Sequence, residues 1–156
     1  MGFKKSKFKI DRSKKGKEKR TFEGKEFDSL MELQFYRDFL LPLKNKGEIK
    51  NIILQPEYIL QKKFYKYGKC VLPIKYVGDY EVEFSDGKTI TYDVKGMPTV
   101  EAKIKRKMFD FQFPEKTLIW IALSIIDGGW IEYGELCKLR AKRKKEKRNN
   151  AEKKCL

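Results

Sequence analysis

The chain has 156 residues, and its 37 Lys and Arg against 22 Asp and Glu give a formal net charge of +15. It contains no histidine, which excludes His-based acid–base catalysis, nucleophile–His pairs and His-ligated zinc sites. Its 3 cysteines are widely spaced, and no apolar run is long enough to cross a bilayer, so we expect a cytoplasmic protein without a thiolate metal site or membrane partner.

The positive charge lies at the two ends of the chain. Residues 1–20 and residues 138–156 each carry 10 basic and 2 acidic side chains, whereas residues 21–137 carry 17 and 18. The pattern predicts a basic flexible arm over 1–20, one domain over 21–137, and a basic helical or disordered tail over 138–156. Such ends fit a polyanion, most simply a nucleic acid, and solvated tails are the alternative.

The first elements of the domain are a small hairpin and a helix. Residues 21–27 predict a hairpin around Gly24, and residues 28–41 predict a helix that ends between Pro42 and Gly47. Ser29 and Glu32 have the spacing of a capping box, in which the glutamate caps the helix. The apolar positions at helical spacing, expected to face the core, are Leu30, Leu33, Tyr36 and Leu40.

A strand and a basic connection follow this helix. Residues 52–60 read as one strand with a bulge or an edge position at Pro56. Gln55 is either a polar contact near a site or an ordinary surface residue. Residues 62–70 predict a hairpin around Gly68, whose lysines are candidates for contact with nucleic acid. These lysines are Lys62, Lys63 and Lys66.

Residues 74–96 predict two strands joined by a tight turn that ends at Gly87. Only a three-residue loop places the apolar side chains on one face, and this register puts Asp79 opposite Asp93. Directly opposed carboxylates repel each other and need a cation or a proton. Mg²⁺ takes one or two carboxylates together with substrate phosphates, and Lys95 lies close enough to assist.

The remaining elements are a second helix, a buried strand and a basic end. Residues 99–111 predict a helix whose buried stripe comprises Val100, Ile104, Met108 and Phe111. Lys103 and Lys107 on its other faces contact either phosphate or solvent. Residues 117–124 are nearly all apolar, as in a parallel strand that is buried on both faces. Residues 127–129 form a turn, residues 130–133 a short strand or lid, and a basic helix follows. Its candidate nucleic-acid contacts are Arg140, Lys142, Arg143, Lys144 and Lys145.

Four blocks in this order resemble the PD-(D/E)XK nuclease superfamily, in particular a phage and prophage branch of it. The blocks are Phe27-Asp28-Ser29 with Glu32, Leu54-Gln55-Pro56, Ile74-Lys75-Tyr76 ahead of Asp79, and Asp93-Val94-Lys95-Gly96. The likeness spans about residues 22–124. The sequence departs from the family pattern where Gly78 replaces a proline before Asp79, and where Asp93 stands at a position that is often glutamate.

The resemblance and the order helix, strand, strand, strand, helix, strand imply an α/β protein, or α+β with a mixed sheet, that has a restriction-endonuclease-like core. The implied activity is Mg²⁺-dependent hydrolysis of DNA, with Mn²⁺ able to substitute. Asp79 and Asp93 would bind the metal with the Val94 carbonyl, Glu32 would bind a second ion or orient water, and Lys95 would position that water. Gln55 and Lys75 would position the substrate.

Within this superfamily the chain is similar to Holliday-junction resolvases and to a transposon-end endonuclease. This favours branched DNA as the substrate, a role in recombination, and the host cytoplasm if a phage encodes the protein. Resolvase chemistry requires two active sites and so implies a homodimer, although the sequence marks no dimer surface. The alternatives are a non-catalytic DNA-binding protein on a nuclease scaffold and an RNA-binding accessory protein.

Overall fold

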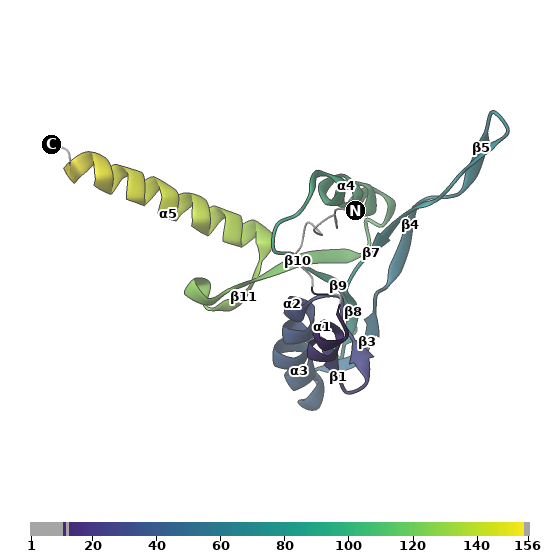
Figure 1. Ribbon diagram of the computed structural model, residues 1–156, viewed down its shortest axis with the longest axis horizontal. Coiled ribbons are helices and arrows are strands. Elements are labelled where there is room, and N and C mark those ends of the chain that lie inside the picture. The colour runs from purple at the N-terminus through teal and green to yellow at the C-terminus, as the bar shows by residue number, and fades with distance from the viewer. Residues whose placement is uncertain (1–10, 12, 155–156) are drawn as a thin grey trace.

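A mixed sheet of five strands, in the order β11-β10-β9-β8-β3, forms the centre of the protein (Figure 1). The computed structural model describes residue 11 and residues 13–154. β9 and β10 are parallel, and the other neighbours are antiparallel. The strands are β3 Ile49–Leu54, β8 Tyr80–Phe84, β9 Thr89–Val94, β10 Thr117–Ser124 and β11 Gly129–Glu132. The protein is therefore of mixed α+β class, as expected.

The hairpin of β8 and β9 has the predicted register. Tyr80 pairs with Tyr92 and Val82 pairs with Ile90, so all these side chains share one face. Gly87 closes the loop with a φ of 87°, a conformation that glycine adopts without strain. The predicted parallel pairing of β10 is confirmed, because it lies alongside β9 and buries Leu118, Trp120, Ile121 and Ala122.

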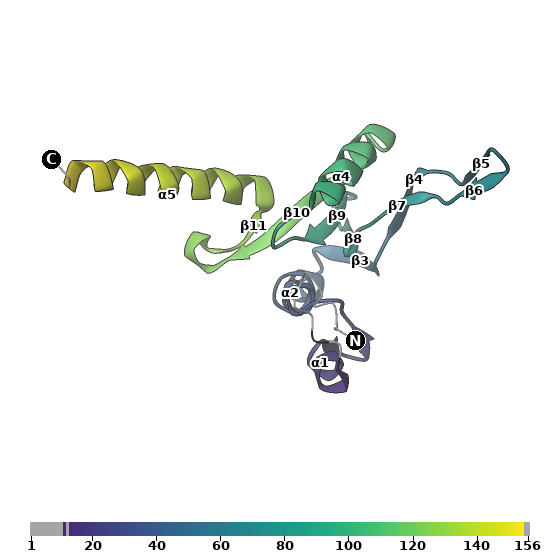
Figure 2. The ribbon, with the colours of Figure 1, turned by 45° about the horizontal axis from the view of Figure 1, so that its top comes forward.

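Helices pack on both sides of the sheet. α2 Leu30–Phe35, the π-helical turn η1 Tyr36–Leu40 and α3 Leu41–Asn45 lie on one side of β10, and α4 Val100–Gln112 lies on the other (Figures 1 and 2). The first set buries Leu33, Phe35, Tyr36 and Leu40 against the sheet. The prediction that Leu30 faces the core is wrong, because this residue is 52% exposed.

The first helix also continues beyond its expected end. Pro42 lies in the first turn of α3, directly after the π-helical turn, and the helix ends only before Gly47. Proline lacks an amide hydrogen and clashes with the preceding turn of a regular α-helix. The wider π-helical turn ahead of Pro42 allows the chain to stay helical through this position.

The predicted buried stripe of α4 is wrong for three of its four positions. Val100, Ile104 and Phe111 are 74%, 55% and 85% exposed, whereas Phe109 is fully buried. The sheet-facing side instead follows Ala102, Arg106, Phe109 and Phe113. The guanidinium of Arg106 lies 5.2 Å from the Trp120 ring and donates a hydrogen bond of 2.6 Å to the Leu118 carbonyl. A stripe that contains an arginine does not register as apolar in the sequence.

The N-terminal segment is more structured than expected. α1 Lys14–Lys19 precedes the small hairpin of β1 Thr21–Phe22 and β2 Lys25–Glu26, which confirms the turn at Gly24. Arg20 is only 6% exposed, and its Nε donates a hydrogen bond of 3.0 Å to the Phe27 carbonyl. Residues 13–20 of the expected arm thus contain a helix and contact the domain, and residues 1–10 and 12 of that arm lie outside the described range.

The expected strand over 52–60 is two strands. β3 ends at Leu54 and β4 Glu57–Gln61 begins after a break at Gln55 and Pro56, where Gln55 has a φ of 49°. β4 pairs with β7 Ile74–Val77, and the connected pair of β5 Phe64–Lys66 and β6 Lys69–Val71 projects from the body (Figure 1). The predicted hairpin around Gly68 is confirmed.

The C-terminal element is one helix, α5 Tyr133–Lys154, that extends away from the sheet (Figure 1). Leu136 in its first turn is fully buried, and Arg143 pairs with Asp127 in the turn before β11. The expected boundary at residue 138 therefore falls inside a continuous helix, because packing of the first turn holds it against the body. Within the described range, no helix has the length and apolar character needed to span a bilayer.

Candidate carboxylate site

Asp79 lies where the ribbon of β3–β4 and β7–β8 bends. The amide of Gln55 donates to the Asp79 carbonyl and the amide of Gly78 donates to the Pro56 carbonyl, each at 3.0 Å. A Cβ on Gly78 would come within 2.7 Å of the Thr91 Cγ2, so the close approach at this bend requires glycine. The predicted ladder thus ends at Tyr80, and Asp79 occupies the break beside it. The bend directs the Asp79 side chain toward the end of β9.

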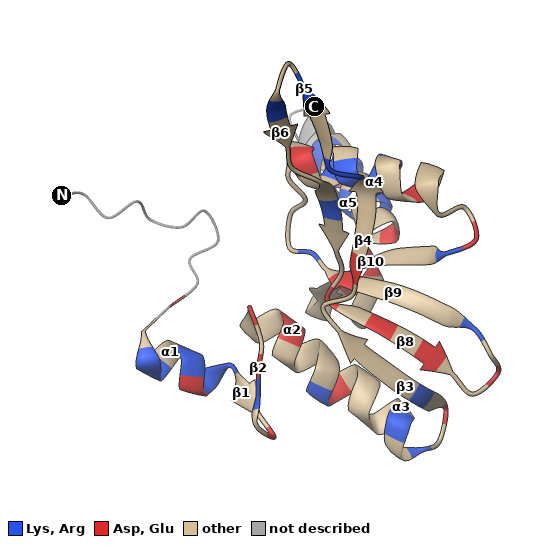
Figure 3. Cartoon of the chain, turned by 90° about the vertical axis from the view of Figure 1, so that its right-hand side faces the viewer, with Lys and Arg blue, Asp and Glu red and all other residues tan. Residues whose placement is uncertain are grey.

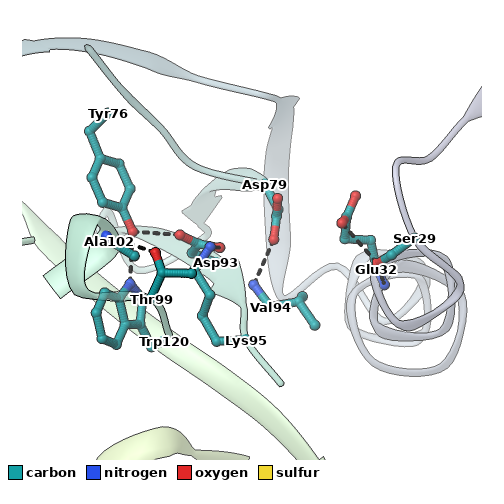
Figure 4. Close-up of polar contacts among 10 residues, drawn as sticks. All are labelled: Ser29, Glu32, Tyr76, Asp79, Asp93, Val94, Lys95, Thr99, Ala102 and Trp120. Atoms are coloured by element: carbon teal, nitrogen blue, oxygen red, sulfur yellow. Dashed lines mark hydrogen bonds and ion pairs between the residues drawn. The ribbon is translucent and has the colours of Figure 1, made fainter. Parts of the chain in front are cut away.

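Asp93 is buried in the middle of a polar chain. It is 2% exposed, and its Oδ2 accepts a hydrogen bond of 2.5 Å from the Tyr76 hydroxyl. That hydroxyl in turn accepts a hydrogen bond of 2.7 Å from Trp120 Nε1 (Figure 4). Burial and the charge of Asp93 raise the pKa of Tyr76, which keeps the phenol protonated and able to donate.

The other oxygen of Asp93 has a different environment. Oδ1 lies 2.7 Å from Lys95 Nζ in an ion pair, but it accepts no hydrogen bond of normal geometry from the described residues. A buried carboxylate oxygen ordinarily has such a partner. One oxygen of Asp93 is therefore fixed by the tyrosine, and the other faces the Lys95 ammonium without a hydrogen bond.

Asp79 is the second carboxylate of the expected pair, but the predicted strand pairing of Asp79 with Asp93 is wrong, because the ladder ends at Tyr80 and Tyr92. Its Oδ2 accepts a hydrogen bond of 2.6 Å from the Val94 amide. Burial, together with the charges of Asp93 and Glu32, raises the pKa of Asp79 to about 9, against the opposing effects of Val94 and Lys95. Figure 4 shows Asp79 between Asp93 and Glu32. The three acids lie close enough to disfavour ionisation of all of them, and a divalent cation would relieve this repulsion.

Glu32 caps its helix. Its carboxylate accepts hydrogen bonds from the Ser29 hydroxyl at 2.8 Å and from the Asp28 amide at 3.1 Å, while the Ser29 hydroxyl accepts from the Glu32 amide. This is the capping role that the spacing of Ser29 and Glu32 predicts. Burial raises the pKa of Glu32, and the charge of Asp93 adds to the effect. A carboxylate held in this cap must leave it before it can bind a metal.

A cleft of about 330 Å³ opens beside the carboxylates, between the first turns of α2 and α4. Glu32, Val94 and Lys95 line it together with Ser29 and Thr99, the N-cap residues of the two helices. Backbone amides at the start of a helix favour anions. The cleft thus joins an ammonium group and helix N-termini to the acidic cluster.

The two residues expected to position the substrate border the site. Gln55 lies in a small pocket with Glu32 and Asp79, and its Nε2 donates a hydrogen bond of 3.0 Å to Asp28. Lys75 lies with Asp93 and Lys95 along a second cleft, and its Nζ is 2.6 Å from a carboxylate oxygen of Glu57. Both are near the carboxylates, and both have another partner.

The acidic side chains do not form a complete metal centre as they stand. Among the described residues no three Asp, Glu or Cys side chains converge closely enough to hold an ion. Asp79 and Asp93 nevertheless fit a hard divalent cation, because Asp93 Oδ1 lacks a hydrogen bond and a cation would relieve the crowding of acids that helps to raise the pKa of Asp79. Glu32 would join them only on release from Ser29.

The predicted nucleic-acid residues lie on three separate elements. Lys62, Lys63 and Lys66 are exposed beside or in β5, and Lys103 and Lys107 are exposed on α4. Of the predicted residues on α5, Arg143 is half-buried beside Asp127, and the other four are exposed, namely Arg140, Lys142, Lys144 and Lys145. Figure 3 shows basic segments on α5 and the β5–β6 pair, and acidic ones on β8.

Sequence reasoning missed the residues that hold Asp93. Tyr76 stands out only as part of a resembling block, and Trp120 is one more apolar residue of a buried strand. The indole N–H of a buried tryptophan needs an acceptor, and this was the signal available in the sequence. Its acceptor was not predictable, because Tyr76 and Trp120 meet only through the packing of β7 against β10.

Fold and site together define a mixed α+β protein with a buried carboxylate, a partly buried carboxylate and a lysine at one end of its sheet. The chain belongs to the family described as "Protein of unknown function (DUF1064)", whose profile matches residues 12–126. The matched range contains the whole carboxylate site. Comparison with curated proteins and with solved structures gave no match.

Proposed function

We propose that this protein is a Mg²⁺-dependent DNA endonuclease with a restriction-endonuclease-like core. The observation that carries the proposal is the arrangement of Asp93, which is buried, fixed through one oxygen by Tyr76 and ion-paired through the other with Lys95 at 2.7 Å. A carboxylate and a lysine so placed, with a second carboxylate at Asp79, suit hydrolysis of a phosphodiester.

The order of elements supports the same core. Along the chain α2, β3, β8, β9, α4 and β10 follow one another, with the β4–β7 ribbon inserted after β3. This is the helix, strand, strand, strand, helix, strand order that the PD-(D/E)XK resemblance implies. Fold alone does not establish an activity, so the proposal depends on the side chains of the site.

Asp79, Asp93 and the Val94 carbonyl would hold the metal. When bound, Mg²⁺ supplies a Lewis acid that polarises the phosphate and lowers the pKa of a water. The chain's own residues position the reactants: Tyr76 orients Asp93, and the Val94 amide orients Asp79. Lys95 offers positive charge to phosphate oxygens in the cleft. Glu32, whose pKa is raised by burial, is a candidate base in a chain without histidine.

A non-catalytic DNA-binding protein on the same scaffold is the second candidate. The capping role of Glu32 favours it, because that carboxylate is occupied by Ser29 and Asp28. Such a protein would bind DNA equally well with and without Mg²⁺.

The deciding experiment compares cleavage of linear, flapped and four-way DNA by the full chain in Mg²⁺, in Mn²⁺ and in EDTA. We expect cleavage only with metal and preferentially on the branched substrates. Asp93→Asn should abolish cleavage and leave DNA binding largely intact, since basic residues supply most of the affinity. Asp110→Asn, an exposed acid on α4, is the matched control and should cleave normally.

Two outcomes would contradict the proposal. Absence of cleavage on every DNA with either metal, at concentrations where binding is saturated, would favour the non-catalytic protein. Undiminished cleavage by Asp93→Asn would remove this site from the reaction. Tighter binding to RNA than to DNA of the same sequence would favour the RNA-binding alternative, and light scattering would test the homodimer that resolvase chemistry implies.

A further inference from the structure

Residues 62–72, here called the ribbon arm, contain the β5–β6 pair and project from the body (Figures 1 and 2). No residue of the arm is buried. An isolated two-stranded ribbon is marginally stable in water, because it has no core to cover either face. The sequence of the arm is therefore not explained by folding alone.

The arm carries positive charge without compensation. It contains Lys62, Lys63, Lys66 and Lys69 and no Asp or Glu. Lys66 and Lys69 are directly paired across the ribbon, an arrangement that destabilises a pair of strands. Within the described part of the chain, no carboxylate forms an ion pair with these four lysines. A polyanion bound along the ribbon would relieve this repulsion.

The arm also exposes three aromatic rings. Phe64, Tyr65 and Tyr67 are 42%, 69% and 91% exposed. The ammonium of Lys66 lies 5.3 Å from the centroid of the Tyr67 ring, and that of Lys63 lies 6.0 Å from Tyr65. Alternating lysines and tyrosines offer both phosphate contacts and flat faces for stacking.

Tyr67 is an unexpected residue for its position. Tyr67 and Gly68 have φ values of 51° and 71°, so both turn residues are left-handed. Such turns favour Asn, Asp or Gly at both central positions, and a bulky residue there is strained. A strained and exposed tyrosine at the tip of a projecting ribbon points to a binding role.

The arm is joined directly to the carboxylate site. β6 leads into β7, and β7 is followed by Gly78 and Asp79 at the bend. β4 leads from that same bend back to the arm. A nucleic acid held by the arm would thus be held by the ribbon that carries Asp79.

We propose that the ribbon arm binds unpaired bases of DNA, with Tyr65 and Tyr67 stacking on bases and the lysines contacting the flanking phosphates. The proposal rests on the proposed function for the choice of DNA as the partner. Bases within an intact duplex already stack on each other, so tyrosine faces select the unpaired bases of gaps and flaps. Stacking on an aromatic side chain is sequence-tolerant.

The test is a fluorescence-anisotropy titration of the full chain in EDTA, which separates binding from cleavage. The DNAs are an intact duplex and the same duplex with a single-stranded gap. Tyr65→Ser combined with Tyr67→Asn removes both rings, and asparagine suits the left-handed turn. Tyr65→Phe combined with Tyr67→Phe keeps both rings, and Phe111→Ala removes an equally exposed ring from α4.

We expect the Ser/Asn variant to lose about tenfold or more in affinity for gapped DNA, as for other stacking residues, and to bind the intact duplex as wild type does. The Phe/Phe variant and Phe111→Ala should retain the preference for the gap. Lys66→Gln combined with Lys69→Gln should weaken binding to every DNA. The same pair should lower the log–log salt slope by about 0.9 for each duplex phosphate that these lysines neutralise in wild type.

Equal binding of gapped DNA by wild type and the Ser/Asn variant would overturn the inference. The inference would also be overturned if the Ser/Asn variant lost binding to vesicles rich in phosphatidylglycerol while its DNA binding was unchanged. The arm would then be a membrane contact. Cleavage is measured separately. If wild type never cleaves DNA but the Ser/Asn variant loses binding to the gap, the proposed nuclease activity is refuted and the role of the arm stands. If wild type cleaves DNA but the variant binds the gap normally, the role of the arm is refuted and the nuclease activity stands.

Discussion

The Tyr76 hydroxyl donates a hydrogen bond of 2.5 Å to Asp93 Oδ2, and Trp120 Nε1 donates to that hydroxyl at 2.7 Å. The chain of donors links β7 and β10 to the aspartate of β9. Because Oδ2 is held in this way, Asp93 Oδ1 faces Lys95 in a fixed position. Tyr76 is thus a positioning residue for the proposed reaction.

Tyr76→Phe should weaken the response to Mg²⁺. Removing the hydroxyl frees the Asp93 carboxylate to turn, and losing such an outer hydrogen bond typically costs about 10–100-fold in metal affinity or activity. The measurement is the Mg²⁺ concentration that gives half-maximal cleavage. Tyr58→Phe is the matched control, because the Tyr58 hydroxyl is bonded to Glu81 and Thr91 but not to Asp93.

Both tyrosine variants should lose stability by about 1–3 kcal/mol, since each leaves buried polar groups unpaired. Only Tyr76→Phe should shift the Mg²⁺ dependence. An equal shift in Tyr58→Phe would mean that the Tyr76 effect comes from general loosening of the fold.

Glu32 can be tested with two substitutions that separate its roles. Glu32→Gln keeps a capping-box side chain that can accept from the Asp28 amide, whereas Glu32→Ala removes the cap and should cost about 0.5–2 kcal/mol. If Glu32 acts as base or ligand, both variants should lose cleavage, although the Gln variant melts like wild type. Normal cleavage by Glu32→Gln would restrict this residue to capping.

Asp79 should give the metal-free protein an unusual dependence of folding stability on pH. The folded pKa of Asp79 is raised to about 9 from 3.8, so between these values the folded state retains a proton that the unfolded state has released. Stability contributed by this group is therefore greatest in acid and falls as pH rises toward 9. Thermal melts in EDTA across that range should show this decline.

Asp79→Asn should flatten the decline, because it removes the titrating group. The exposed Asp38→Asn should leave it unchanged. A loss of about 1 kcal/mol moves the melting midpoint by about 2–4 °C in a protein of this size. Mg²⁺ should restore stability at alkaline pH in wild type by binding the folded state. An identical pH profile in Asp79→Asn and wild type would show that this carboxylate is not crowded by its neighbours.

α5 should supply salt-sensitive DNA affinity. Replacing Lys142, Lys144, Lys145 and Lys147 by Gln removes exposed charge and spares Arg143, which pairs with Asp127. We expect weaker binding to any sequence and a log–log salt slope lower by about 0.9 for each duplex phosphate that these lysines neutralise in wild type. Cleavage at saturating protein and low salt should persist. The control variant replaces Lys44, Lys46, Lys50 and Lys88 by Gln, which removes the same charge from another part of the protein. An equal loss of DNA affinity in this control would show that the effect is nonspecific electrostatic attraction.

Residues that are neighbours along the chain specify the local structure around the site. The alternation of Tyr80 and Val82 with Ile90 and Tyr92 allows only one register to place all four on one face, so the hairpin could be predicted. Gly87 marked its turn, and the apolar run of β10 marked a strand buried on both faces. Ser29 and Glu32 marked the start of α2. Each depends on residues that are near in sequence.

Tertiary packing decided what local patterns leave open. α4 has two possible faces, and only contact with β4, β7 and β10 selects the face that buries Phe109 and includes Arg106. The bend at Gln55 and Gly78, which moves Asp79 out of the ladder, follows from a close approach to Thr91 across the ribbon. The partners of Asp93 come from strands distant in sequence. A side chain's hydrogen-bond partner across a fold depends on how the layers pack, and that is set by the sum of many contacts that no single stretch contains.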